Sequence, residues 1–295
     1  MKQGLINPVK RELRYVIESV VKHLYVDQQT EAGLTKIEDR LFDPRGPKIA
    51  QRNTGPARMG VDRPAAGERS RSLMHGIFVG EIQALEGAGR TCYDFDDETA
   101  PFQLKLDMAR QCWDESRHCE ISVKLGDHMG TEIGEYTEST FLFAAACNPD
   151  PVLRLCGVNR ALEGLAIDVF NSMKDFGNES GDPILEFCED WMLADEVTHV
   201  KMGSDWLRRL TDTDPERRER ALEFQRTVDA IFNLGGFRGE DDENPIQLAR
   251  NFRRLAGFTD DENDSLAALA RESTEQARQM AEAATAALEA SAQGS

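Results

Sequence analysis

The sequence has few features of an exported, membrane-spanning or disulfide-bonded protein. No apolar run approaches the roughly 18 residues that mark a transmembrane helix, and the first residues, MKQGLINP, contain no apolar core of a signal peptide. The six cysteines form no Cys-x-x-Cys pair and no compact framework, which favours free thiols in a reducing compartment. We therefore expect a cytoplasmic protein without a membrane segment.

Basic residues are scarce relative to acidic ones. The chain has 35 Lys and Arg against 53 Asp and Glu, which gives a formal net charge of −18. Because nucleic-acid-binding proteins neutralise phosphates with Lys and Arg, we expect no nucleic-acid partner. The chain also lacks a Gly-rich phosphate loop, a dinucleotide fingerprint and a Ser-His-Asp arrangement. Functions that depend on those motifs are not expected.

Two Glu-x-x-His motifs are the most informative feature that is present. They span Glu115–His118 and Glu196–His199, and an aspartate directly precedes each of them, at Asp114 and Asp195. Three residues turn an α-helix through roughly 300°, so the Glu and His of each motif project on the same side, one turn apart. A carboxylate and an imidazole held in this way can bind one metal ion. A single motif of this kind is common on charged surface helices, so the interpretation depends on what accompanies it.

Each motif follows one further glutamate at the spacing of a helical hairpin. Glu81 lies 34 residues before Glu115, and Glu163 lies 33 residues before Glu196. One Glu from each of two helices and Glu-x-x-His from two others is the ligand set of di-iron and di-manganese carboxylate bundles. The predicted metal ligands are therefore Glu81, Glu115, His118, Glu163, Glu196 and His199. Glu86 remains the alternative to Glu81, although it lies about 140° further around the helix.

With this ligand order, the chain resembles the ferritin-like di-iron proteins. The Asp-Glu-x-Arg-His motif at residues 114–118 is similar to that of bacterial multicomponent monooxygenases and of ribonucleotide reductase small subunits. Three segments resemble a little-characterised group of bacterial ferritin-like domains of unknown function: HGIFVGEIQALE at 75–86, RALE at 160–163 followed by Asp168, and DEVTHV at 195–200. The resemblance covers about residues 70–210.

The resemblance implies a metal centre that activates dioxygen. In the resembling enzymes, reduced iron activates dioxygen to hydroxylate, N-oxygenate or desaturate a substrate, with electrons from an external donor. We accordingly expect a di-iron oxygenase or oxidase with two Fe ions, or Mn as the alternative metal. Asp114, Asp195 and Arg117 are the expected supporting residues, because the Asp before each ligand Glu contacts a metal-bound His in those enzymes. An iron-handling or peroxide-scavenging protein and a non-catalytic metal-binding bundle remain the alternatives.

The helical periodicity predicts an all-α protein, a ferritin-like four-helix bundle with additional N- and C-terminal helices. The expected bundle helices are 70–93, 101–129, 151–176 and 183–210. Further helices are expected at 9–42 before the bundle, and at 215–233, 246–256 and 260–290 after it. We therefore predict three parts: 1–69 with a Pro/Gly-rich loop, 70–212 as the metal-binding bundle, and 213–295 as a helical extension. A homodimer is one expected assembly.

The third bundle helix carries the candidate substrate contacts. Ala166, Ile167 and Phe170 share the side of Glu163 and could wall a pocket for a small organic substrate, or could simply be bundle core. Arg160 lies one turn before Glu163. It could receive an acid group of a substrate or pair with a ligand carboxylate, and a surface salt bridge is the equally weighted alternative.

Overall fold

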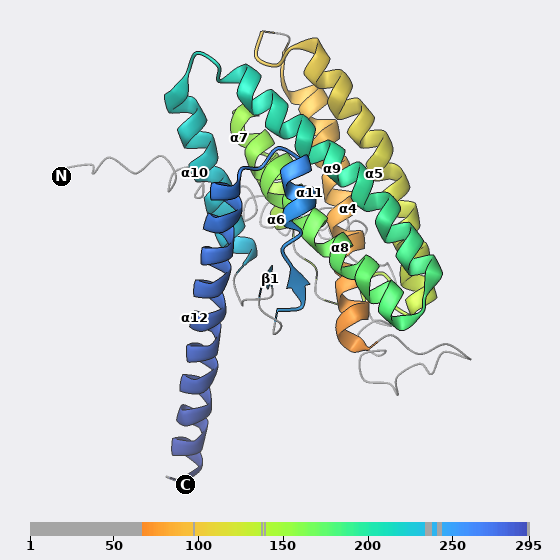
Figure 1. The fold of residues 1–295 in the computed structure, drawn as a ribbon, viewed down its shortest axis with the longest axis vertical. Helices are drawn as coiled ribbons and strands as arrows, with labels where there is room; N and C mark the ends of the chain where they lie inside the picture. The colour runs from red at the N-terminus through yellow and green to blue at the C-terminus, as the bar shows by residue number, and fades with distance from the viewer. Residues whose placement is uncertain are drawn as a thin grey trace, which may run out of the picture. The chain divides into compact units, whose positions relative to one another are not determined.

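The chain is described by a computed structural model over residues 67–96, 98–136, 138, 140–233, 238–240 and 244–293. These residues are almost entirely helical, as predicted (Figure 1). The predicted N-terminal helix and the Pro/Gly-rich loop lie outside the described residues. The chain divides into two compact units, residues 1–154 and 155–295. Over the described ranges, no helix combines the length and apolar character that crossing a membrane requires.

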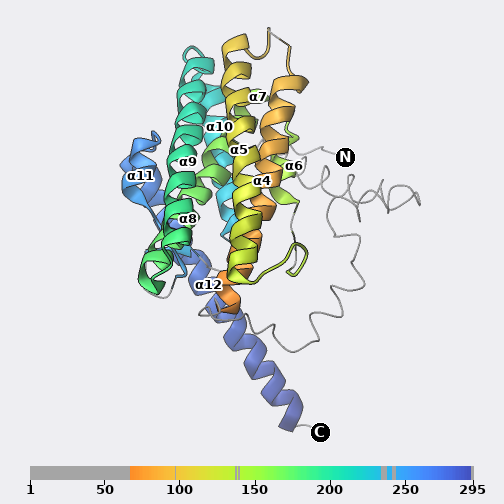
Figure 2. The ribbon, with the colours of Figure 1, turned by 90° about the vertical axis from the view of Figure 1, so that its right-hand side faces the viewer.

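The described part of the first unit contains two long helices that lie side by side. They are α4 (Glu68–Asp94) and α5 (Phe102–Met129), close to the predicted bounds of 70–93 and 101–129 (Figures 1 and 2). Each helix buries one apolar stripe, as the spacing of its sequence predicts. The buried apolar residues include Met74, Ile77, Phe78, Ala84 and Ala88 of α4, and Leu104, Met108 and Leu125 of α5.

The ends of α5 follow from the conformational preferences of Pro101 and Gly130. Pro101 precedes the first turn with φ of −54°, which suits a ring that fixes this angle. Gly130 has φ of +82° and ends the helix in a left-handed conformation, with its N–H donated to the carbonyls of Asp127 and Gly126. The short helix α6 (Phe141–Ala146) then packs against α4.

The third predicted helix is present but changes its winding. It starts as α7 (Pro151–Leu155), continues as the π-helix η1 (Cys156–Leu162) and finishes as α8 (Glu163–Ser180). Its predicted end at residue 176 is four residues too early, because Gly181, with φ of +69°, provides the left-handed cap. The π segment was not predicted. Such segments are rare and occur frequently at functional sites.

Helices α9 (Pro183–Leu210) and α10 (Pro215–Phe232) begin where the sequence predicts. In both cases Asp-Pro supplies the start: Asp182 accepts from the N–H groups of Ile184 and Leu185, and Asp214 accepts from that of Arg217. Within the second unit, α8 and α9 lie side by side, and η1 contacts both α9 and α10.

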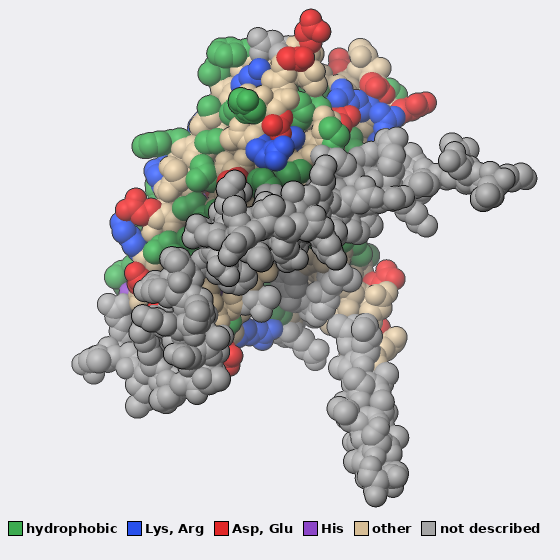
Figure 3. All heavy atoms as spheres, turned by 180° about the vertical axis from the view of Figure 1, so that it is seen from behind, with side chains coloured by type: hydrophobic (Ala, Val, Ile, Leu, Met, Phe, Trp, Pro, Cys, Tyr) green, Lys and Arg blue, Asp and Glu red, His purple; other side chains and the backbone are tan. Residues whose placement is uncertain are grey.

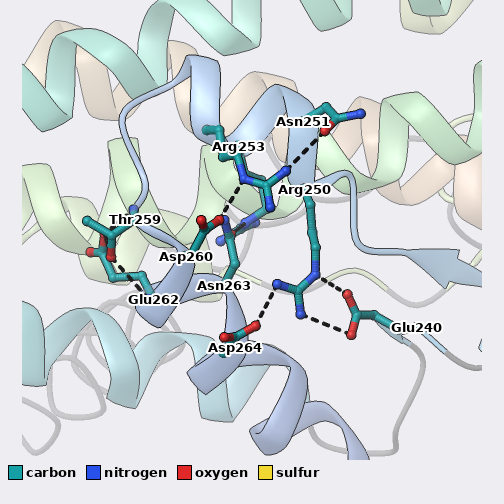
Figure 4. Close-up of polar contacts among 10 residues, drawn as sticks. Glu240, Arg250, Asn251, Arg253, Thr259, Asp260, Glu262, Asn263 and Asp264 are labelled. Atoms are coloured by element: carbon teal, nitrogen blue, oxygen red, sulfur yellow. Dashed lines mark hydrogen bonds and ion pairs between the residues drawn. The ribbon is translucent and has the colours of Figure 1, made fainter.

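The chain after α10 differs from the prediction. The helix expected at 246–256 begins only at residue 250, because two-residue strands β1 (Arg238–Gly239) and β2 (Ile246–Gln247) pair in parallel first. Helices α11 (Arg250–Leu255) and α12 (Asp260–Gln293) follow. Their polar contacts, shown in Figure 4, include Arg250 between Glu240 and Asp264, and Arg253 donating to Asn263.

The face shown in Figure 3 has no patch of a single charge in its described part. Acidic, basic and hydrophobic side chains are interspersed there. Large apolar side chains that remain exposed include Phe102 and Trp113 of α5 and Phe187 of α9.

Candidate metal centre

The first unit holds a buried triad of two carboxylates and one imidazole, here called triad 1: Glu81, Glu115 and His118. The Nδ1 atom of His118 lies 3.1 Å from Oε2 of Glu81 and 3.2 Å from Oε2 of Glu115. Gln111, one turn before Glu115, donates its amide to Oε1 of that glutamate at 3.3 Å. None of the three side chains of triad 1 is more than 6 % exposed.

The second unit holds a triad of the same composition, here called triad 2: Glu163, Glu196 and His199. The Nδ1 atom of His199 lies 3.5 Å from Oε1 of Glu196 and 4.0 Å from Oε2 of Glu163. All three residues are buried. Glu163 is the first residue of α8, and its backbone N–H bonds to the carbonyl of Val158, five residues back. The π-helix therefore ends directly at this candidate ligand.

Both triads fit a divalent cation by their charge and burial. Within each triad, one candidate ligand atom from every residue lies within 4.8 Å of the others. A buried carboxylate is costly unless it is paired or binds a metal, and two carboxylates beside one imidazole keep a net negative charge even if the imidazole is protonated. Oxygen and imidazole donors suit iron or manganese. Each cluster could therefore hold a metal ion.

Two features of the backbone position triad 2. Gly203 lies one turn after His199 on α9, and a Cβ there would come within 2.6 Å of the Cβ of Asn159 in η1. Only glycine lets these two segments approach so closely. Arg253 of α11 donates to the carbonyl of Gly164, the residue after Glu163, at 2.7 Å. This contact could not be predicted from the sequence, because Arg253 and Gly164 are 89 positions apart.

The structure distinguishes Glu81 from its alternative. Glu81 lies beside His118, whereas Glu86 is half-buried and belongs to no described ligand cluster. Asp114 is buried and paired with Arg117, and Nε of Arg110 lies 3.5 Å from it. Asp195 is half-buried. The predicted contact of either aspartate with a ligand histidine stays a prediction.

The guanidinium of Arg160 is buried and engaged by three residues. It donates through Nε to Gln225 at 2.8 Å, and through its other nitrogens to Ser204 and Glu262. The contact with Glu262 is a salt bridge, which was one of the predicted alternatives. It is not a surface salt bridge, because the side chain of Arg160 is buried. Ile167 and Phe170 are buried and Ala166 is half-buried. Their predicted role in binding a substrate stays a prediction.

The cysteines near triad 1 are thiols rather than thiolates. All six cysteines of the chain are free. Burial raises the pKa of Cys112 to about 11, and burial together with the carboxylates of Glu81 and Glu115 raises the pKa of Cys119 to about 12. Neither cysteine belongs to the clusters of candidate metal ligands found among the described residues.

Comparison with known proteins gives one match. A family described as "Protein of unknown function (DUF455)" matches residues 17–264, which is most of the chain. The chain belongs to this family. No match was found among the curated proteins or among the solved structures. The family match includes both triads and agrees with the expected resemblance to a group of unknown function.

Proposed function

We propose that the two triads hold two metal ions, and that the protein is a non-haem di-iron oxygenase or oxidase acting on a small organic substrate. The observation that carries the proposal is the duplication: two separate units of one chain each bury a Glu together with a Glu-x-x-His pair. Chance surface motifs would not be buried twice with the same composition. The ferritin-like resemblance of residues 70–210 points to the same chemistry.

Bound iron would supply the one-electron chemistry that dioxygen activation needs. In the oxygenase form, one oxygen atom enters the substrate and the other leaves as water, with two electrons and two protons from an external donor. The side chains of the two triads would hold the ions and balance their charge, and Gln111 would orient Glu115 through its amide. Manganese is the alternative metal.

Metal content and oxygen uptake test the proposal. We expect about two iron ions per chain and oxygen consumption by the reduced, iron-loaded protein. Glu81→Ala and Glu163→Ala should each lower the metal content, whereas Glu86→Ala should leave it unchanged. Two bound ions without oxygen uptake would instead support the non-catalytic metal-binding bundle. A protein that binds no iron or manganese would exclude both.

A further inference from the structure

A cavity of about 350 Å³ lies in the first unit, at the end of the helix pair opposite to Pro101. This volume is within the range of small-molecule sites, roughly 300–1,000 Å³. The cavity is lined by residues of α4, of α5 and of the loop that follows α5: Met74, His75, Phe78, Ser122, Val123, Gly126, Asp127, Thr131, Glu132 and Ile133. Asp127 and Ile133 are exposed, so the cavity reaches the surface.

The cavity lies one helical turn from triad 1. Phe78 precedes Glu81 by three residues on α4, and Ser122 follows His118 by four residues on α5. Such spacings place side chains on the same helix face, about one turn or 5.4 Å apart. A molecule in the cavity would therefore lie next to triad 1.

The inner wall of the cavity contains the hydroxyl of Ser122, which forms no hydrogen bond within the described structure. Ser122 is 1 % exposed, and its Oγ atom has no hydrogen-bond partner there. A buried polar group left in this state is costly, so it indicates a ligand or water on the cavity side. His75, also buried, accepts the N–H of Gly134 through Nε2 at 2.9 Å. An accepting nitrogen requires the neutral imidazole, which agrees with the lowered pKa that burial gives His75.

The charged side chains of the lining are acidic. Asp127 and Glu132 line the cavity, and none of the described lining residues is Lys or Arg. Arg71, a basic side chain near this loop, is engaged by the carbonyl of Gly130 and by Glu135. Met74, Phe78 and Val123 add apolar walls. This combination favours a cation with an apolar body and disfavours a carboxylate or a phosphate.

We propose that this cavity binds the substrate and that the substrate is a small protonated amine with an apolar body. Its ammonium group pairs with Asp127 and Glu132 at the rim, and a polar atom of its body bonds to the hydroxyl of Ser122. The inference rests on the proposed function for what happens to the bound molecule. The binding itself does not depend on it.

Three probes of nearly equal shape test the charge preference: benzylamine, benzyl alcohol and benzoate. Binding to the purified full-length chain is measured by titration calorimetry, which needs neither turnover nor oxygen. We expect benzylamine to bind at millimolar or lower concentrations and benzoate to bind at least about fivefold more weakly. A preference for benzoate, equal affinities, or no binding by any probe at millimolar concentrations would overturn the proposal.

Two variants locate the site. Asp127→Asn should weaken benzylamine binding about fivefold and leave benzyl alcohol unaffected, because it removes one charge from the rim. Its matched control is Glu120→Gln, which removes an exposed acid from the same helix outside the cavity. Ser122→Phe should fill the cavity and abolish binding of all probes, with circular dichroism as the check on folding. Full affinity in either cavity variant would place the amine elsewhere. Because oxygen uptake and metal content are separate measurements, failure of the amine site is distinguishable from failure of the di-iron proposal.

Discussion

Asp114 and Asp195 each stand one residue before a predicted metal ligand. A carboxylate that accepts the second N–H of a metal-bound imidazole fixes the ring and makes it a stronger ligand, and losing it usually weakens metal binding by about 10–100-fold. We therefore expect Asp114→Ala and Asp195→Ala to weaken iron binding by this amount while the helical content is retained. Direct metal titration measures the effect, with the exposed Glu120→Ala as control. Unchanged metal affinity in both variants would show that neither aspartate supports a metal-bound histidine.

Glu138 contributes to the pH dependence of the stability of the first unit. Burial raises the pKa of this carboxyl to about 7 from its ordinary value of 4.5. Because the folded state holds the proton more tightly than the unfolded state, the free energy of unfolding should fall as the pH rises from about 4.5 to about 7. Glu138→Gln should remove this contribution, so the variant gains stability over the parent at pH 8 but not at pH 4.5. Urea unfolding across this range measures it, and parallel curves for the two proteins would contradict the assignment.

At the scale of the elements, the approach of α9 to η1 can be tested with two glycines. Gly203→Ala would place a Cβ 2.6 Å from that of Asn159, so we expect a loss of about 1–3 kcal/mol of stability. Gly76 is an exposed glycine of α4 with no atom in reach of an added Cβ. The matched substitution Gly76→Ala should stabilise the protein by about 0.5–1 kcal/mol through helix propensity alone. Chemical denaturation measures both, and equal effects would mean that η1 and α9 are not closely packed.

Two neighbouring arginines of α11 allow a buried salt bridge to be compared with an exposed one. Arg253 is buried and donates to Asp168 at 2.9 Å and to the carbonyl of Gly164, whereas Arg254 pairs with Asp260 at the surface. Arg253→Met leaves Asp168 buried with less compensation and should cost about 3–5 kcal/mol. Arg254→Met should cost less than about 1 kcal/mol. Denaturation midpoints of the two variants measure these losses of stability. Similar losses for both would show that burial of Arg253 has no special effect.

Local signals in the sequence were sufficient to predict most helices, but they did not predict the π-helical segment η1. Asp-Pro before α9 and α10 and the apolar stripes of α4 and α5 act within a few residues, so they could be identified directly. All residues of η1 are buried, polar and apolar alike, so no alternation of buried and exposed positions in the sequence marked the change of winding. The strands β1 and β2 are two residues long and depend on pairing across the intervening chain. Arg238 and Arg253 are fully buried, which residue type alone argues against.

In the candidate metal centre, too, contacts within one helix could be predicted from the sequence, whereas contacts between distant segments could not. Glu115 with His118, and Glu196 with His199, could be predicted because one helix sets their relative direction. Glu81 was preferred to Glu86 from the sequence, but its position beside His118 depends on packing of α4 against α5. The engagement of Arg160 by Gln225, Ser204 and Glu262 could not be predicted for the same reason. These partners lie 44 to 102 residues away.

At the scale of the whole molecule, stabilisation by metal tests whether the two triads bind metal independently. A ligand that binds only the folded state stabilises it by about 2.7 kcal/mol at 100 times its dissociation constant. If the two triads form one centre, His118→Ala or His199→Ala alone should remove most of the stabilisation by Fe(II), and the double variant should lose little more. Two independent sites would instead give losses that add. Thermal unfolding with and without metal measures the four proteins.

His128→Ala, which removes a half-buried histidine of α5 outside the triads, is the control and should keep the full stabilisation. Additive losses would refute a shared centre while leaving two separate metal sites, and no stabilisation of the parent by Fe(II) or Mn(II) would refute metal binding itself.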